Sequence, residues 1–131
     1  TYFNKKDHLW TLYEYENGEF SIPEYAKSGV IYGGCNCGNC HITIASSGDI
    51  MACRRVTDSK VANVYEDRLA DVWVGQIENY RDYDKFTKCS KCELKAWCRG
   101  CPAVANGTNG SFYGADPQCW KTRNDITGEE L

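Results

Sequence analysis

The sequence predicts a small α+β domain in which a β-hairpin and several short helices are organised around two cysteine-rich centres. Three observations lead to this prediction. The chain has 131 residues, which is enough for one domain with a modest hydrophobic core. Nine of these residues are cysteines, a density that no hydrophobic core requires. The apolar patterns typical of helices and strands are short, and loops rich in Gly and Asn separate them.

The N-terminal element is a predicted amphipathic helix over residues 5–16, "KKDHLWTLYEYE". Its apolar face would contain Leu9, Trp10 and Tyr13, and the Asn-Gly pair that follows would end it.

The next element is a predicted hairpin in the segment "HITIASSGDIMACRR". Ile42 and Ile44 alternate with polar residues, "SSGD" forms the turn, and "IMAC" returns. We expect the hairpin to bring Cys53 back beside Cys40.

A second helical region is predicted over residues 67–86, with Asp67 as its N-cap and Gly75 as a candidate break. Its expected core face consists of Leu69, Val72, Trp73, Ile77 and Tyr80. The segment "NGTNGSFYGADPQC" is then predicted to be a loop that returns Cys119 to the other cysteines.

Charge and hydropathy exclude two classes of partner. The net charge is −3, without a long basic run, so binding to nucleic acid through phosphate neutralisation is not expected. No stretch of about 18 apolar residues is present, so no membrane span is expected. The N-terminus also lacks the apolar core of a signal peptide.

A disulfide scaffold is disfavoured because nine is an odd number and because C-x2-C pairs chelate one centre more naturally than they form bridges. Thiolates that bind metal in a reducing compartment fit better. We therefore expect the protein to be cytoplasmic.

Nine thiols suffice for two four-thiolate centres with one to spare. Two metals remain open. Zinc takes four thiolates, often from two C-x2-C pairs, such as 37/40 and 89/92 with 98/101 in reserve. Iron–sulfur cubanes draw four thiolates from more scattered positions, and in bacterial ferredoxins the last Cys, followed by Pro, ligates the other cluster. Here Cys101 precedes Pro102 and Cys119 lies far along the chain, which favours two interleaved clusters.

Basic residues flank the cysteines, and positive charge beside a cluster favours its reduced state. These residues are Arg54, Arg55, Lys88, Lys91, Lys95 and Arg99. The two histidines, His8 and His41, are not expected to be ligands, because strand alternation directs His41 away from its neighbour Ile42.

The cysteine pattern Cys35-x12-Gly48-x4-Cys53, then Cys89-x2-Cys92-x5-Cys98-x2-Cys101, then Cys119 resembles the SPASM domain of radical S-adenosylmethionine enzymes. Three further segments are similar to that family, namely "ITIASSGDIMAC", "ANVYEDRLADVW" and "DPQC". The resemblance covers roughly residues 33 to 121. It departs from the family in the x2 spacing before Cys101, where x3 is usual.

The resemblance implies two auxiliary 4Fe–4S clusters. The first cluster would take Cys53 and Cys101 with two of Cys35, Cys37 and Cys40, of which we expect Cys37 or Cys40 to be the spare. The second cluster would take Cys89, Cys92, Cys98 and Cys119. Zinc would be a contaminant of aerobic preparations. Arg54 stands where the sulfatase-maturating branch of the family has Asp, which argues against that activity.

The resemblance also implies a domain organisation. Residues 1–32 would be a helix and linker from a missing upstream barrel, residues 33–121 the two-cluster domain, and residues 122–131 a tail. The radical-initiating motif C-x3-C-x2-C is absent from the sequence, so we expect the chain not to be catalytic alone and to reach S-adenosylmethionine only through the upstream barrel.

The implied function is that of the C-terminal part of a radical S-adenosylmethionine oxidoreductase that modifies a peptide or protein substrate. In it the clusters would relay electrons and the domain would help seat the substrate.

Two alternatives remain open at this stage. One is a structural zinc module for protein interaction. The other is a free-standing carrier of electrons with two clusters. Acid-labile sulfide distinguishes the zinc module from the other two interpretations, and the sequence upstream of Thr1 distinguishes the carrier from an excised domain.

Overall fold

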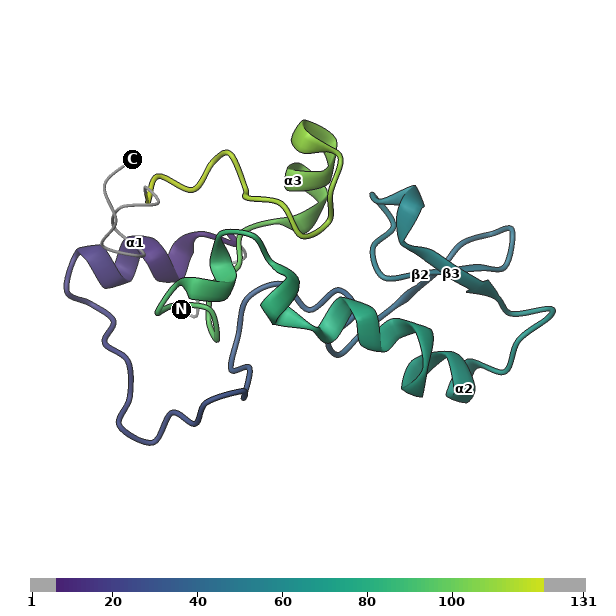
Figure 1. Ribbon diagram of the computed structural model, residues 1–131, viewed down its shortest axis with the longest axis horizontal. Helices are drawn as coiled ribbons and strands as arrows, with labels where there is room; N and C mark the ends of the chain where they lie inside the picture. The colour runs from purple at the N-terminus through teal and green to yellow at the C-terminus, as the bar shows by residue number, and fades with distance from the viewer. Residues whose placement is uncertain (1–6, 122–131) are drawn as a thin grey trace, which may run out of the picture.

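A computed structural model describes residues 7–121 and shows an elongated molecule, with α1 at one end, the sheet and α2 at the other, and α3 between them (Figure 1). The predicted tail 122–131 and the first residues of the N-terminal helix lie outside the described residues. In chain order the elements are α1 (Trp10–Glu16), the strands β1 (Thr43–Ile44) and β2 (Asp49–Met51), the 3₁₀ helix η1 (Thr57–Ser59), strand β3 (Lys60–Asn63), α2 (Leu69–Val74), the 3₁₀ helices η2 (Gln76–Arg81), η3 (Tyr83–Lys85) and η4 (Cys89–Lys91), and α3 (Pro102–Asn109).

The predicted hairpin is confirmed, and a third strand extends it. β1 pairs antiparallel with β2, with Thr43 opposite Met51. β2 also pairs antiparallel with β3, which follows it in the sheet order β1-β2-β3. β3 was not predicted, because a four-residue strand that begins with Lys60 carries too little alternation to be recognised. Together with the short helices, this sheet confirms the predicted small α+β domain.

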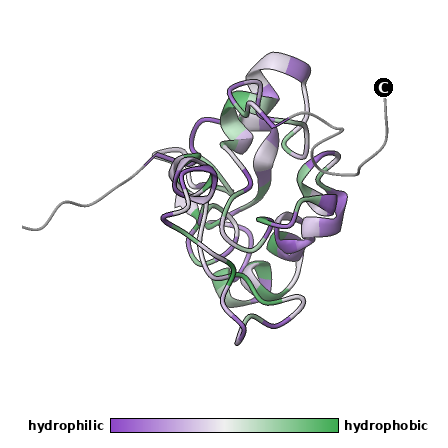
Figure 2. Ribbon diagram, turned by 90° about the vertical axis from the view of Figure 1, so that its left-hand side faces the viewer, coloured by the Kyte–Doolittle hydropathy of each residue, from purple (hydrophilic) through white to green (hydrophobic). Residues whose placement is uncertain are grey.

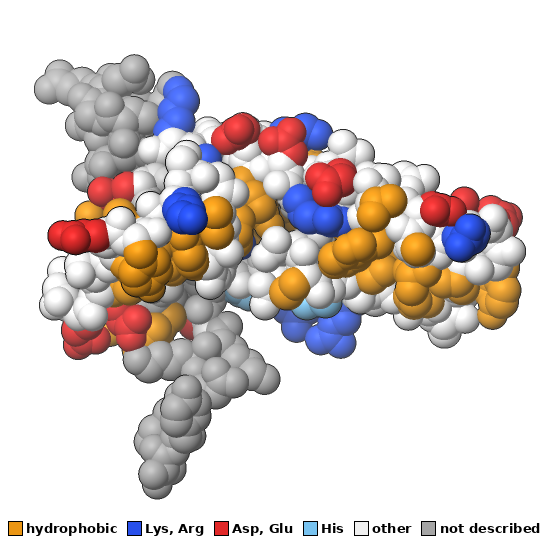
Figure 3. Space-filling model, turned by 90° about the horizontal axis from the view of Figure 1, so that it is seen from below, with side chains coloured by type: hydrophobic (Ala, Val, Ile, Leu, Met, Phe, Trp, Pro, Cys, Tyr) orange, Lys and Arg blue, Asp and Glu red, His pale blue; other side chains and the backbone are white. Residues whose placement is uncertain are grey.

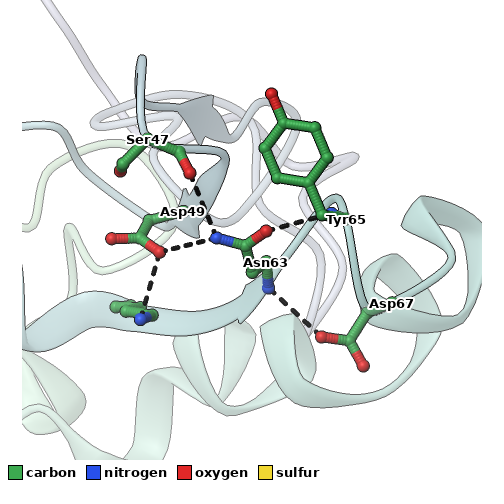
Figure 4. A network of polar contacts seen from close by, with 6 residues as sticks. Ser47, Asp49, Asn63, Tyr65 and Asp67 are labelled. Atoms are coloured by element: carbon green, nitrogen blue, oxygen red, sulfur yellow. Dashed lines mark hydrogen bonds and ion pairs between the residues drawn. The ribbon is translucent and has the colours of Figure 1, made fainter.

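A polar network around Asn63 ties the β1–β2 turn to β3 (Figure 4). The Asn63 side-chain amide donates to Asp49 (3.0 Å) and to the carbonyl of Ser47 (3.3 Å), and its oxygen accepts the backbone N–H of Tyr65 (2.9 Å). Gly48 occupies the turn with φ +87°, and a Cβ there would lie 2.7 Å from the Tyr65 ring. Only glycine therefore fits this turn.

The N-terminal helix is shorter than predicted, and its buried face is different. It runs from Trp10 to Glu16 with Asn17 as its C-cap residue, so it ends where the Asn-Gly signal predicted. Leu9 and Leu12 are buried and pack with Leu94 and Cys98, whereas Tyr13 is exposed. The prediction placed Tyr13 inward because it lies four residues from Leu9, but the helix packs on the Leu9–Leu12 edge instead.

The segment 67–86 is not one helix. It breaks at Gly75, as suspected, and the rest is 3₁₀ rather than α-helical. Arg68 is the N-cap residue of α2, while the carboxylate of Asp67 accepts the backbone N–H of Asn63. Val72 and Ile77 are buried as predicted, but Leu69 at the start of α2 is exposed.

The predicted loop after the cysteine segment begins with a helix. Pro102 is the first residue of α3, which runs to Asn109 and ends at Gly110 in the left-handed conformation. Pro is favourable at the first position of a helix, since its missing N–H has no intrahelical partner there. The chain from Gly110 to Cys119 is irregular, as predicted.

The hydrophobic core consists of three small clusters. Figure 2 shows hydrophobic residues in short stretches between hydrophilic ones, and Figure 3 shows exposed hydrophobic side chains in several separate patches. One core cluster joins α1 to the segment 92–98, a second lies between the sheet and α2, and a third contains Ala52, Val56, Phe86 and Phe112. Cysteines pack against the first and third of these clusters.

Candidate metal centres

The structure separates eight of the nine cysteines into two groups of four. All nine are free thiols. One group lines a cavity of about 260 Å³, here called the first cavity, and consists of Cys35, Cys37, Cys53 and Cys101. The other group lines a small cavity of about 20 Å³, here called the second cavity, and consists of Cys89, Cys92, Cys98 and Cys119.

Loops and element ends deliver the four thiols of the first cavity. Cys35 and Cys37 come from the loop before β1, Cys53 lies two residues after the end of β2, and Cys101 is the N-cap residue of α3. Cys101 is thus separated from Cys98 by only two residues and yet faces the other cavity. The tight turn at Gly100, with φ +62°, redirects the chain between them.

Cys40 is exposed and lines neither cavity. The hairpin was expected to place Cys40 beside Cys53, and the structure instead places Cys35 and Cys37 on the same cavity as Cys53. His41 also lines this cavity, and its Nε2 lies 3.9 Å from the Cys37 Sγ. His8 lines it too, so both histidines, which were not expected to be ligands, lie at the first cavity.

The second cavity is built by η4, the turn that follows it and the returning loop. Cys89 begins η4, Cys92 follows it, and Cys98 is buried against α1. The Cys98 thiol donates to the backbone carbonyl of His8 (3.3 Å). Leu12 and Leu94 form the apolar part of the wall, so α1 covers this cavity.

Burial and neighbouring thiols make two thiols of the second cavity, those of Cys89 and Cys98, hard to ionise. Desolvation, and then the nearby Cys92, Cys119 and Cys98, raise the pKa of Cys89 to about 12. Desolvation also raises the pKa of Cys98. Four thiolates so close together are stable only around a compensating cationic centre, because each buried negative charge raises the energy of the others. A metal or cluster core supplies that charge.

In the first cavity the thiols of Cys35 and Cys37 shift each other's pKa in opposite directions. A side-chain hydrogen bond from Cys37 lowers the pKa of Cys35, and the same interaction raises the pKa of Cys37, with a smaller contribution from Cys53. Binding of a metal centre requires both as thiolates, so its assembly would release protons.

Asp116 connects the two groups of cysteines. It is 3% exposed, and its Oδ2 accepts the backbone N–H of Cys101 (2.8 Å). Its backbone carbonyl accepts the N–H of Cys119 (3.0 Å), and its Oδ1 accepts the N–H of Gln118 (2.8 Å). One buried residue thereby fixes a thiol of each cavity. The "DPQC" segment that contains Asp116 was recognised from the family resemblance, but its sequence does not indicate this role.

The basic residues near the cysteines are not equivalent. Arg54 and Arg55 are exposed and line the first cavity. Lys88 lines the second cavity, and its Nζ lies 3.5 Å from the carbonyl of Cys119. Arg99 alone among the six is buried, at 2% exposure. Sequence reasoning grouped it with the other five because nothing local distinguishes it.

The donor set fits iron–sulfur clusters, since each cavity offers four sulfur ligands from scattered positions. Within residues 7–121, no three His, Cys, Asp or Glu side chains converge as the ligands of a single metal ion would. No helix in the same part of the chain is long and apolar enough to cross a membrane.

Comparison with known proteins agrees with this donor set. Residues 35–102, more than half of the chain, match the model of the SPASM family, described as an iron–sulfur cluster-binding domain. No curated protein and no solved structure matches the chain. The match confirms the resemblance seen in the cysteine pattern, although Cys119 lies beyond it. The chain therefore belongs to the SPASM family of iron–sulfur cluster-binding domains.

Proposed function

We propose that the chain binds two 4Fe–4S clusters and serves as the auxiliary domain of a radical S-adenosylmethionine enzyme that modifies a peptide or protein. The observation that carries the cluster part is the separation of eight thiols into two cavities of four. In this proposal the first cluster takes Cys35, Cys37, Cys53 and Cys101, and Cys40 is the spare thiol. The second cluster takes the four thiols of the second cavity.

The enzymatic part of the proposal is supported by the family alone. Bound clusters would supply one-electron transfer, so the domain would relay electrons from the substrate and help seat it beside an upstream barrel. A cytoplasmic location belongs to the same proposal, because a reducing compartment keeps the thiols available. The sequence that precedes Thr1 in the gene tests this part, since a barrel with a C-x3-C-x2-C motif is expected there.

Iron and sulfide content tests the cluster part. Prepared without oxygen, the chain should bind about eight iron and eight sulfide, as two cubanes require. Stoichiometric zinc without acid-labile sulfide after anaerobic reconstitution would instead favour the structural zinc module. Zinc after aerobic purification decides nothing, because empty thiolate sites take it up. A gene without an upstream barrel would favour the free-standing electron carrier.

Single cysteine variants test the assignment. Cys92→Ala should lose the second cluster and keep the first, and Cys53→Ala should do the reverse. Cys101→Ala should behave like Cys53→Ala, although Cys101 is close to Cys98 in sequence. Cys40→Ala is the matched control and should retain all the iron. Loss of the second cluster in Cys101→Ala would contradict the assignment.

A further inference from the structure

In the sequence, Arg99 stands between Cys98, which lines the second cavity, and Cys101, which lines the first. Its side chain reaches across to the loop that carries Cys35. Nη2 donates to the carbonyls of Gly33 (2.9 Å) and Cys35 (3.1 Å). Nη1 donates to the carbonyl of Lys95 (2.7 Å). The guanidinium thus joins the segment of one centre to the segment of the other.

An aromatic ring and a glycine pack closely against the Arg99 guanidinium. The guanidinium lies over the Tyr83 ring, 4.5 Å from its centroid. Gly34 also lies close to the guanidinium, with φ +86°, and a Cβ there would be 3.0 Å from Nη2. A side chain at position 34 would therefore strain the backbone and displace the guanidinium. The space is shaped to hold Arg99 in one orientation.

Within the part of the chain that the structure describes, the charge of Arg99 has no acidic partner. Among the ion pairs of residues 7–121, none includes Arg99. Carbonyl oxygens and an aromatic ring offer only partial negative charge, and an unpaired buried cation is costly. Burial lowers the pKa of the Arg99 guanidinium, and Tyr83, then Cys35 of the first cavity and Cys98 and Cys89 of the second, act on it in the opposite direction.

We infer that Arg99 is a positioning residue and cation shared by the two centres. Its hydrogen bonds hold the Cys35 loop beside the second centre, and its charge stabilises the negative charge of both. This inference rests on the proposed binding of two clusters. A cubane with four thiolates carries a net charge of about −2, which a buried guanidinium offsets far better than a solvated surface lysine does.

The consequence is a shift in reduction potential at two sites from one side chain. A cation beside a cluster favours the reduced, more negative state, and so raises the potential. Removal of the Arg99 charge should lower the potentials of both clusters. Lys121 provides the matched control. It is also buried, but it lines only the second cavity and pairs with Glu93 (3.0 Å).

The experiment uses the full chain, reconstituted without oxygen, with Arg99→Met, Arg99→Lys and Lys121→Met. Iron and sulfide are counted first, and a redox titration followed by electron paramagnetic resonance then gives the midpoint potential of each cluster. Arg99→Met should lower both potentials, Lys121→Met should shift only the second, and Arg99→Lys should restore both toward wild type. A wild-type chain with fewer than two clusters would refute the proposed function, independently of any variant.

If the wild-type chain holds both clusters, two results would overturn the inference. The first is an Arg99→Met variant that holds both clusters and keeps the wild-type potential at either of them. The second applies if Arg99→Met does not assemble its clusters. The Arg99→Lys variant then decides, because it keeps the charge: two clusters near their wild-type potentials in Arg99→Lys support the inference, and loss of either cluster from Arg99→Lys overturns it.

Discussion

Replacement of Asp116 by alanine tests how the two centres are held together. The Asp116 carboxylate accepts two backbone N–H groups, those of Cys101 and Gln118. Cys101 is the N-cap residue of α3, and no side chain of its own caps that helix. A carboxylate at this position also interacts favourably with the helix N-terminus. Asp116→Ala would leave the N–H of Cys101 without its acceptor in a site that is 3% exposed.

The magnitude follows from these two hydrogen bonds. A buried hydrogen bond to a charged acceptor contributes about 1.5–3 kcal/mol, whereas a typical protein hydrogen bond contributes about 0.5–1.5 kcal/mol. The bond to Cys101 therefore accounts for about 2 kcal/mol, and the bond to the exposed Gln118 for about 1 kcal/mol. The expected loss is about 3 kcal/mol, which corresponds to roughly 10 °C in the thermal midpoint of a domain of this size.

The assay is thermal unfolding of the cluster-loaded protein without oxygen, followed by circular dichroism at one fixed scan rate. Asp67→Ala is the control, because Asp67 also accepts a backbone N–H, that of Asn63 (3.1 Å), but at an exposed site. It should shift the midpoint by no more than a few degrees, as expected for about 1 kcal/mol or less. A midpoint for Asp116→Ala close to that of Asp67→Ala would refute the reasoning.

Two further predictions concern the hairpin and the clusters. Hydrogen bonds from Asn63, and then from Lys60, lower the pKa of Asp49, so Asn63→Ala should raise this pKa toward its ordinary value in a carboxyl NMR titration. Because the folded pKa is depressed, the stability that ionised Asp49 contributes is complete above a pH of about 4 and is lost as the pH falls through the folded pKa. An unchanged pKa in the variant would contradict this. Removal of the iron by a chelator should unfold most of residues 33–121, because the core is small. A well-dispersed amide spectrum of the stripped chain would show that ligation is not needed.

The sequence was sufficient where a local pattern determines the structure. The alternation of Ile42 and Ile44 before "SSGD" predicted the hairpin, and Gly48 is the residue that its turn requires. The break at Gly75 was also readable, because glycine interrupts a helix wherever packing does not hold it. The family resemblance in the cysteine spacing is confirmed over residues 35–102.

The sequence was insufficient where distant packing decides. Both Leu12 and Tyr13 could face inward from α1, and contact with Leu94, more than 80 residues away, selects Leu12. The helix α3 contains Gly107, Thr108 and Asn109, which are poor helix formers, and its only clear local signal is the proline at its start. Nothing local separates Arg99 from five other basic residues near cysteines, because its role depends on the carbonyl of Cys35, 64 residues earlier.

The two cavities have separate sets of ligands, but the same residues support both of them. Each cavity has its own four thiols, so loss of one ligand should affect one cluster. The supports are shared, however. Asp116 holds Cys101 of the first cavity and Cys119 of the second, and Cys53 and Cys89 pack against the same central core around Phe86 and Phe112. A chain without one cluster therefore keeps the contacts that position the other, which is why the cysteine variants should lose one cluster at a time, whereas complete removal of iron should unfold both.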